Sequence, residues 1–472
     1  MELNAAPKDS MIENRTFDEI AVGDSASSER TLAQEDIDLF AVVSGDVNPA
    51  HMDSAYAETD LFHKIIAHGM WGGGLISALF GTRLPGPGTI YLSQDLHFRA
   101  PVAIGDTITT TVTAREKKPE NQRIIFDCVC TNQTGHVVIT GMAEVRAPSE
   151  KVRRPRIELP EVRLSRHQRF RDLLIRTAGQ PPVPVAVAHP CDDLSLGAAI
   201  EMAKAGLVVP ILVGPAAKIY AVALAAGLDI DAYRIVDVPH SHAAAAAAVA
   251  LVRAGEAALL MKGSLHTDEL MHEVVAHDTG LRTERRLSHV YVMDVPSYPR
   301  PLLITDAALN IAPSLEEKRD IIQNAIDLAH IMGTALPKVA ILAAVETVNP
   351  LMRSTLDAAA LCKMADRGQI TGGLLDGPLA FDNAVSPQAA TQKGIVSPVA
   401  GQADILVVPD LEAGNMLAKQ LSFLAGADAA GVVIGARVPI ILTSRADSER
   451  TRIASCAIAV LMARAAQAAG AA

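Results

Sequence analysis

The sequence predicts two units of different fold class: an α+β unit up to about residue 150, then an α/β unit about twice its size. Before residue 150, the stretches GDTITTTVTARE, IIFDCVCTNQ and HVVITGMAEVRA alternate polar and apolar residues as half-buried strands do. A helical stretch at about 69–81 interrupts these strands. After about residue 165, short apolar runs such as PVAVAH, VVPILVG and KVAILAAV alternate with Ala-rich helical stretches. That pattern is typical of a mostly parallel sheet covered on both faces.

The units are separated by PSEKVRRPRIELPEVRLSRHQ, which is charged, broken by prolines and without periodicity, and therefore indicates a linker. We assign residues 1–150 to the first domain, 151–180 to the linker and a leading helix, and 181–472 to the second domain. In the first domain, one helix followed by long antiparallel strands indicates a sheet wrapped around a central helix. In the second, the apolar runs have no fixed period, which argues against a solenoid.

Composition narrows the functional classes. Of the 472 residues, 49% are apolar, enough for a large core, and the formal net charge is −11 without a basic stripe. Nucleic acid is therefore not expected as a partner. The N-terminus has no apolar signal segment, and no stretch is expected to span a bilayer. The five cysteines are scattered without zinc-site spacing, which predicts a reduced, cytoplasmic protein without a structural metal.

The segment SGDVNPAHMD holds Asp46 and His51 five positions apart on a Pro-broken stretch. Taken alone, the pair is either part of a turn or a proton-transfer pair tuned by burial. Shortly afterwards, HGMWGGG at 68–74 opens the predicted helix. Backbone N–H groups at a helix N-terminus suit a developing negative charge, and glycines let a ligand approach the backbone closely.

Three blocks of the first domain, SGDVNPAHMD, AHGMWGGGLISALFG and LPGPGTIYLSQDLHFRAPVAIGD, occur in this order. Together they resemble an (R)-specific enoyl-CoA hydratase of the MaoC-like hotdog family, over about residues 15–147. The resemblance implies an α+β hotdog fold and hydration of a short-chain 2-enoyl-CoA to (R)-3-hydroxyacyl-CoA. The run WGGG departs from the simple apolar residues expected at that place, which leaves the preferred acyl chain length open.

The same resemblance assigns roles to individual residues. It implies that Asp46 and His51 share the two proton transfers and that Asn48 shapes the turn between them. Gly69, at the start of the helix, is expected to contact substrate. Ser77 falls where the family has a hydroxyl that lines the site, although a serine there also serves helix packing equally well.

In the second domain, PIILTSRADSERTR at 439–452 ends a predicted buried strand in a polar loop. There Ser444, Arg445 and Asp447 precede a helix. An arginine fork beside hydroxyls and a helix start suits phosphate. The alternative is an ordinary helix cap with a surface arginine.

Further blocks, including DLSLGAAIEMAKAGLVVPILVGP, ALLMKGSLHTDEL and VVPDLEAGNMLAKQLSFLAGA, complete a pattern that resembles a phosphate acetyl/butyryltransferase domain, from about residue 181 to the end. This resemblance implies a two-lobed α/β unit of the isocitrate/isopropylmalate dehydrogenase type with its site between the lobes. The reaction implied is acyl-CoA plus phosphate giving acyl phosphate plus CoA, without a cofactor. Ser444 would donate to the oxyanion and Arg445 would hold phosphate.

The base that removes the CoA thiol proton is less evident. Some members of the acetyl branch have an aspartate seven residues after the serine, where this chain has Thr451, so Asp447 is the nearest carboxylate. Asp410 and Asn415 of PDLEAGN are expected to end another buried strand at the same sheet edge. Lys262 of MKG is expected either to pair with phosphate or to extend along the surface.

Two hypotheses follow. In the first, the chain is a bifunctional acyl-CoA enzyme that assembles as at least a homodimer, since hotdog sites usually form between two hotdog units. In the second, the hydratase is joined to a non-catalytic transacylase-like domain for acyl-CoA sensing and oligomerisation, as in fused malic enzymes. The TSR motif favours activity, because a sensor needs neither Ser444 nor Arg445. A first domain that is only a CoA-binding scaffold is disfavoured because it retains Asp46 and His51.

Overall fold

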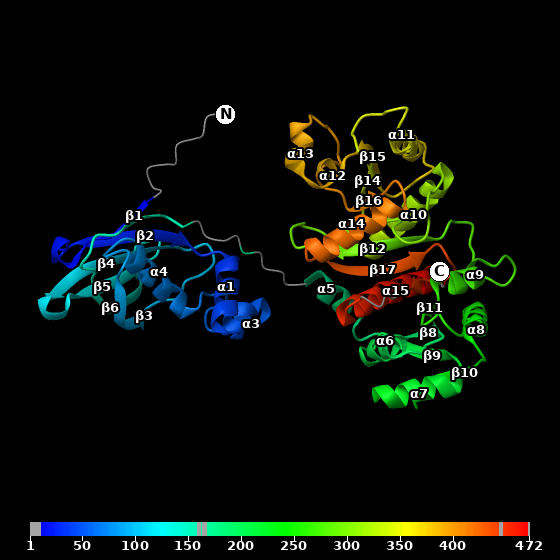
Figure 1. Ribbon diagram of the computed structural model, residues 1–472, viewed down its shortest axis with the longest axis horizontal. Coiled ribbons are helices and arrows are strands. Elements are labelled where there is room, and N and C mark those ends of the chain that lie inside the picture. The colour runs from blue at the N-terminus through cyan, green and yellow to red at the C-terminus, as the bar shows by residue number, and fades with distance from the viewer. Residues whose placement is uncertain (1–10, 158–161, 163–167, 443–446, 471–472) are drawn as a thin grey trace. The chain divides into compact units, whose positions relative to one another are not determined.

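The computed structural model describes residues 11–157, 162, 168–442 and 447–470 (Figure 1). The chain forms two compact units, Met1–Leu164 and Ser165–Ala472, each with its own hydrophobic core. Ser444 and Arg445 lie outside the described residues.

The first unit is an antiparallel sheet in the order β2-β4-β5-β6-β3 with one long helix, α4, packed on it. Its strands are β2 (Ser25–Thr31), β3 (Ile90–Phe98), β4 (Thr107–Lys118), β5 (Arg123–Thr131) and β6 (Val137–Arg146). Its helices are η1 (Phe17–Glu19), α1 (Gln34–Ser44), α2 (Pro49–Met52), α3 (Ser54–Thr59), α4 (Gly69–Thr82) and η2 (Pro119–Asn121).

Alternating side chains create the inner face of this sheet. In β5, every second residue is fully buried, and in β4 the residues that share this face are Ile108, Thr110, Val112 and Ala114. Trp71, Ile76, Leu79 and Phe80 of α4 belong to the same core. The predicted helix and the three predicted strands β4, β5 and β6 are confirmed, whereas the prediction omitted β2 and β3 as strands.

A glycine allows α4 to lie close to the sheet. A Cβ atom added to Gly72 would come within 2.3 Å of Ile139 Cδ1 on β6. By contrast, a Cβ atom on Gly74, two positions later, would meet nothing within 4 Å. The WGGG run therefore contains a glycine needed for helix–sheet packing, in addition to any need of a ligand.

The second unit contains an 11-stranded sheet in the order β10-β9-β8-β11-β18-β17-β12-β13-β16-β14-β15. Its strands are β8 (Val183–Ala188), β9 (Val208–Gly214), β10 (Arg234–Asp237), β11 (Leu259–Lys262), β12 (Ser288–Asp294), β13 (Leu302–Thr305), β14 (Lys338–Leu342), β15 (Leu374–Leu379), β16 (Ile405–Val407), β17 (Asp428–Ile434) and β18 (Ile440–Ile441). Its helices are α5 (Gln168–Thr177), α6 (Asp193–Lys204), α7 (Ala216–Ala226), α8 (Ser241–Arg253), α9 (Thr267–Val275), α10 (Leu315–Ile331), α11 (Arg353–Asp366), α12 (Phe381–Val385), α13 (Pro387–Gln392), α14 (Leu411–Leu424) and α15 (Glu449–Gly470).

Strand direction divides this sheet into two parallel groups. The strands from β10 to β18 in the sheet order run parallel to one another, and so do the strands from β13 to β15. Between them, the pairings β18–β17, β17–β12 and β12–β13 are antiparallel. Because three reversals separate the groups, the two groups point in opposite directions. The apolar runs predicted as strands are confirmed, and the mostly parallel sheet has an antiparallel centre.

Helix α15 corrects one expectation. Its length and composition would allow it to cross a membrane, whereas the sequence analysis expected no stretch long and apolar enough to do so. In the structure, however, its residues from Ala454 to Val460 are buried, and the helix packs on β17, α5 and α6. It is the central core helix of the second unit.

Each of the five cysteines is a free thiol.

The region predicted as a linker is partly structured. It begins with β7 (Arg153–Pro155), which pairs antiparallel with β1 (Met11–Glu13) and so belongs to the first unit. Lys151 adds an ion pair to Glu19, at 2.9 Å between Nζ and Oε2. At the other end, the expected leading helix is α5, which packs on α15.

We predict that Gly72→Ala lowers the free energy of unfolding of the first unit by about 1–2 kcal/mol. Ile139 is only 3% exposed, so the clash with its Cδ1 outweighs the helix-propensity gain of about 1 kcal/mol. Gly74→Ala is the matched control and should stabilise the unit by about 0.5–1 kcal/mol. Denaturant titration followed by fluorescence of Trp71, the single tryptophan of the chain, measures both. Equal effects of the two substitutions would contradict the packing account.

Candidate functional site

The segment around Asp46 is a tight turn between two helices. Helix α1 ends at Gly45, whose φ of 76° lies in the left-handed region that glycine adopts readily. Asp46 Oδ1 then accepts a hydrogen bond from the backbone N–H of Asn48 at 3.1 Å. Asn48 in turn caps α2, because its Oδ1 accepts from Ala50 N–H at 3.1 Å. The proline that interrupts this segment is therefore the first residue of α2, and His51 lies on that helix. Asn48 shapes the turn, and it is not among the residues that line the cavity beside His51.

One backbone hydrogen bond fixes the orientation of His51. Its Nδ1 lies 2.9 Å from the carbonyl oxygen of Ile66. A carbonyl only accepts, so Nδ1 carries the proton. In neutral His51, Nε2 is therefore a bare proton acceptor, which is the form that a general base requires.

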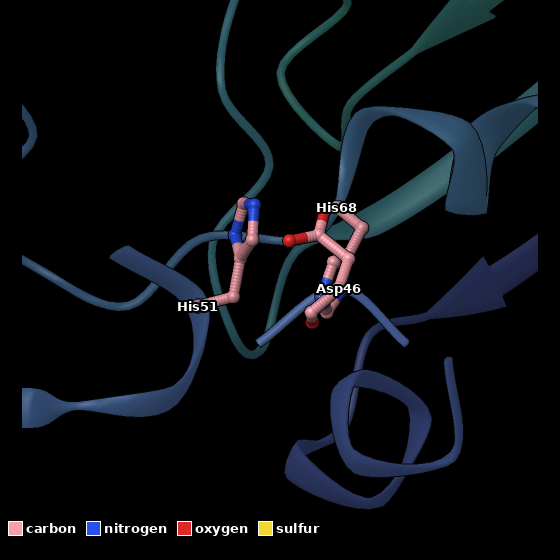
Figure 2. Close-up of side chains that lie close together, drawn as sticks. All are labelled: Asp46, His51 and His68. Carbon is pink, nitrogen blue, oxygen red and sulfur yellow. The ribbon is translucent and has the colours of Figure 1, made fainter. Parts of the chain in front are cut away.

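A second histidine joins the pair. His68, the residue before α4, places its Nε2 3.0 Å from the backbone oxygen of Asp46. Its ring lies 4.1 Å from the His51 ring, between centroids, and it is only 2% exposed. Figure 2 shows the Asp46, His51 and His68 side chains gathered in one place. The sequence prediction quoted the HGM motif but gave His68 no role, and its position just before a helix was the only signal.

His51 and His68 line a cavity of about 300 Å³, whereas Asp46 lies next to the two histidines outside the cavity lining. The floor of the cavity is apolar and buried, with Trp71, Ile108 and Val138 among its residues. Its rim is exposed and includes Phe98 and Phe62. The cavity therefore leads from an open apolar mouth past two imidazoles to a closed apolar end, as an acyl chain attached to a larger carrier would require.

Of the two residues on α4 that were predicted to contact substrate, Gly69 lines the cavity and Ser77 does not. Gly69 lines the cavity at the first turn of α4, where backbone N–H groups have no acceptor within the helix. Ser77 is exposed and does not line the cavity of this chain. Five residues separate Ser77 from Gly72, which turns its side chain by about 140° away from the face that packs on the sheet.

The arrangement is suited to proton transfer. One side-chain ligand atom from each of Asp46, His51 and His68 lies within 4.8 Å of the other two. Such a group also has the ligand types of a metal site, and it is the one cluster of this kind among the described residues. Two imidazoles line the cavity, and a carboxylate lies next to them.

For the second unit, the structure describes only the surroundings of the predicted site. Ser444 and Arg445 are outside the described residues. Asp447, which follows them, accepts a hydrogen bond from Arg452 Nη1 through its backbone oxygen at 2.8 Å. Arg452 is 8% exposed and pairs with Glu201 of α6 at 2.7 Å, so it fixes the start of α15.

Lys262 lies at the same sheet edge as the end of β18. It ends β11, and the preceding Met261 is in parallel register with Ile441 of β18. Its Nζ donates to the backbone oxygens of Gly263 at 3.1 Å and Leu265 at 3.0 Å. The ammonium group is therefore held at the sheet edge where β18 ends.

Asp410 and Asn415 are at the opposite edge, so their predicted position is wrong. They follow β16, which belongs to the parallel group that runs against β18. Asp410 Oδ1 caps α14 by accepting from Ala413 N–H at 2.9 Å. Asn415 Nδ2 donates to Ala307 O at 3.2 Å. Both side chains hold α14 in place, and apolar runs alone did not reveal the direction of their strand.

Tyr291 on β12 was not predicted as a site residue. Burial, followed by the negative charge of Asp447, raises the pKa of the Tyr291 hydroxyl. Its ring packs edge-on against His289, with 4.4 Å between centroids. Asp447 therefore lies close enough to β12 for its charge to act on Tyr291.

Comparison with known proteins identifies both parts of the chain. The family model described as phosphate acetyl/butaryl transferase matches residues 240–460. A phosphate acetyltransferase of Rhizobium meliloti is 68% identical over 293 residues, which are 62% of this chain and 93% of that protein. The chain belongs to the phosphate acetyl/butyryltransferase family. The crystal structure of a branched-chain phosphotransacylase from Enterococcus faecalis matches this chain with a TM-score of 0.53 and 30% sequence identity. The match covers 60% of this chain and 99% of that protein.

The first unit of this transferase-family chain is a MaoC-like domain. The family model for the MaoC-like domain matches residues 20–132. An unliganded R-hydratase from Pseudomonas aeruginosa shares 44% identity, and the match covers 33% of this chain and all of that protein, with a TM-score of 0.32. The chain therefore joins a hotdog-like MaoC unit to a phosphotransacylase unit.

Proposed function

We propose that the chain is a bifunctional acyl-CoA enzyme. The first unit hydrates short-chain 2-enoyl-CoA to (R)-3-hydroxyacyl-CoA, and the second transfers an acyl group between CoA and phosphate. The observation that carries the first activity is the cluster of Asp46, His51 and His68, in which the two histidines line a mainly apolar cavity and Asp46 lies beside them. The second activity is supported by family membership and by the retained TSR motif.

Hydration requires two proton transfers. One of Asp46 and His51 removes a proton from water while the water oxygen bonds to the β-carbon of the thioester. Negative charge then develops on the thioester oxygen, and the N–H groups at the start of α4, where Gly69 lines the cavity, are suited to stabilise it. The proton taken from water is then delivered to the α-carbon, directly or through the other residue, so both residues return to their starting state. The product is the 3-hydroxyacyl thioester.

Acyl transfer requires that two anionic reactants meet. In this proposal Arg445 binds phosphate through its fork and Ser444 donates to the tetrahedral oxyanion. Asp447 is the nearest carboxylate to act as the base for the CoA thiol. Lys262 supports the assignment, because its ammonium group is held at the sheet edge where β18 ends, and the TSR motif follows β18 in the sequence.

The fold type of the second unit is also part of the proposal. Two parallel strand groups that run in opposite directions, joined by antiparallel strands, fit the two-lobed isocitrate/isopropylmalate dehydrogenase type. A crystal structure with CoA bound would test this, since it should place CoA between the two groups.

We predict that the protein is at least a homodimer. β3 is an edge strand, and it exposes Ile90, Tyr91, Leu92 and Phe98, the last of which lies at the mouth of the hydratase cavity. A second hotdog unit on this edge would cover the apolar residues. Light scattering should give a mass of two or more chains. A monomer with full hydratase activity would contradict the proposal.

We predict that Asp46→Asn and His51→Gln each lower the rate of crotonyl-CoA hydration by about 10²–10⁴-fold, the usual contribution of a general acid or base. Phosphate-dependent release of CoA from acetyl- or butyryl-CoA by the same samples should be unchanged. This second assay is the control for folding and assembly. Hydration at the parent rate in either variant would show that the residue transfers no proton.

We predict that Arg445→Lys raises the KM for phosphate much more than the KM for acyl-CoA, because lysine keeps the charge but loses the two-pronged fork. Ser444→Ala should instead lower kcat by about 10²–10³-fold with both KM values little changed. Steady-state kinetics with each substrate varied will separate the two effects. If Arg445→Lys changed both KM values equally, the sensing and oligomerisation alternative would be favoured.

A further inference from the structure

The protonation of His68 follows from its hydrogen bond. Its Nε2 lies 3.0 Å from the backbone oxygen of Asp46, which only accepts, so the ring proton is on Nε2. In the neutral ring, Nδ1 is therefore a lone-pair acceptor. This atom is buried and has no hydrogen-bond partner among the described residues.

A buried acceptor without a partner is unfavourable, by about 1–3 kcal/mol. His68 lines the cavity beside His51, whose ring is 4.1 Å away. The nearby Asp46 carboxylate and the bare Nε2 of His51 are acceptors too. A buried acceptor of this kind needs a donor, and a water molecule has two hydrogens, one for this nitrogen and one for a neighbouring acceptor.

We propose that His68 Nδ1 accepts one hydrogen of the water that adds to the 2-enoyl thioester. This inference rests on the proposed hydratase function and adds a third residue to its site. The second hydrogen of the water points to the base, Asp46 or His51, which takes it as the C–O bond forms at the β-carbon. His68 orients the water and keeps its own proton on Nε2, where the bond to Asp46 holds the turn.

Two amide substitutions separate these two functions of His68. In His68→Gln, the longer side chain places an amide near the former Nε2, so the donor to Asp46 is retained and the acceptor at Nδ1 is lost. In His68→Asn, the shorter side chain places an amide oxygen near the former Nδ1, so the acceptor is retained and the donor is lost. His136→Gln, at an exposed histidine in the β5–β6 turn, is the matched control.

The test measures crotonyl-CoA hydration by the full chain. His68→Gln should lower kcat by about 10–100-fold, the effect of one strong hydrogen bond, with KM changed less than about twofold. His68→Asn should retain more of the parent kcat than His68→Gln does. The His136→Gln control should match the parent, and phosphate-dependent CoA release should be unchanged in every variant.

The opposite order, with His68→Gln active and His68→Asn inactive, would overturn the inference and leave His68 as a residue that only positions the turn. Parent protein that hydrates no 2-enoyl-CoA would overturn the proposed function itself. Fluorescence of Trp71 reports whether the variants fold. If they do not, ¹⁵N NMR of labelled histidine in the parent decides: a proton on His68 Nδ1 would overturn the inference.

Discussion

The proposed hydratase site depends on how closely α4 approaches the sheet. The absence of a side chain at Gly72 lets the helix lie against Ile139, and this contact sets the position of the helix start. His68 immediately precedes that start, and its ring bonds to the backbone of Asp46, while Ile66 O orients His51. Two hydrogen bonds to backbone carbonyl groups therefore fix both proton-transfer residues. Packing in the core and chemistry in the cavity are parts of one arrangement.

Sequence predicted the elements whose side chains carry a clear period. β5 alternates strictly and β4 does so over its first eight residues, while α8 combines high helix propensity with buried alanines such as Ala244 and Ala248. β2, with the sequence SASSERT, has no apolar alternation and is a strand because β4 pairs with it along its length. β3 exposes most of its residues, as an edge strand does. These strands depend on pairing with their neighbours, which a local pattern does not encode.

The site was predicted to a similar extent. Asp46 and His51 were recognised because three blocks occur in a fixed order, and the structure brings the two side chains into one cluster with His68. His68 was missed because its contribution is a bond to a backbone atom 22 residues earlier. Asp410 was placed at the wrong sheet edge because strand direction is a property of topology, and three antiparallel pairings reverse it.

In the proposed function, joining the two units brings two reactions of CoA thioesters into one chain. The central claim is that the MaoC-like unit is a working hydratase in this context, since the second unit already belongs to a family of phosphate acyltransferases. The most direct measurement is chiral analysis of the product after the purified full chain is incubated with crotonyl-CoA. The account predicts (R)-3-hydroxybutyryl-CoA as the product. Unchanged crotonyl-CoA, or the (S) product, would contradict it.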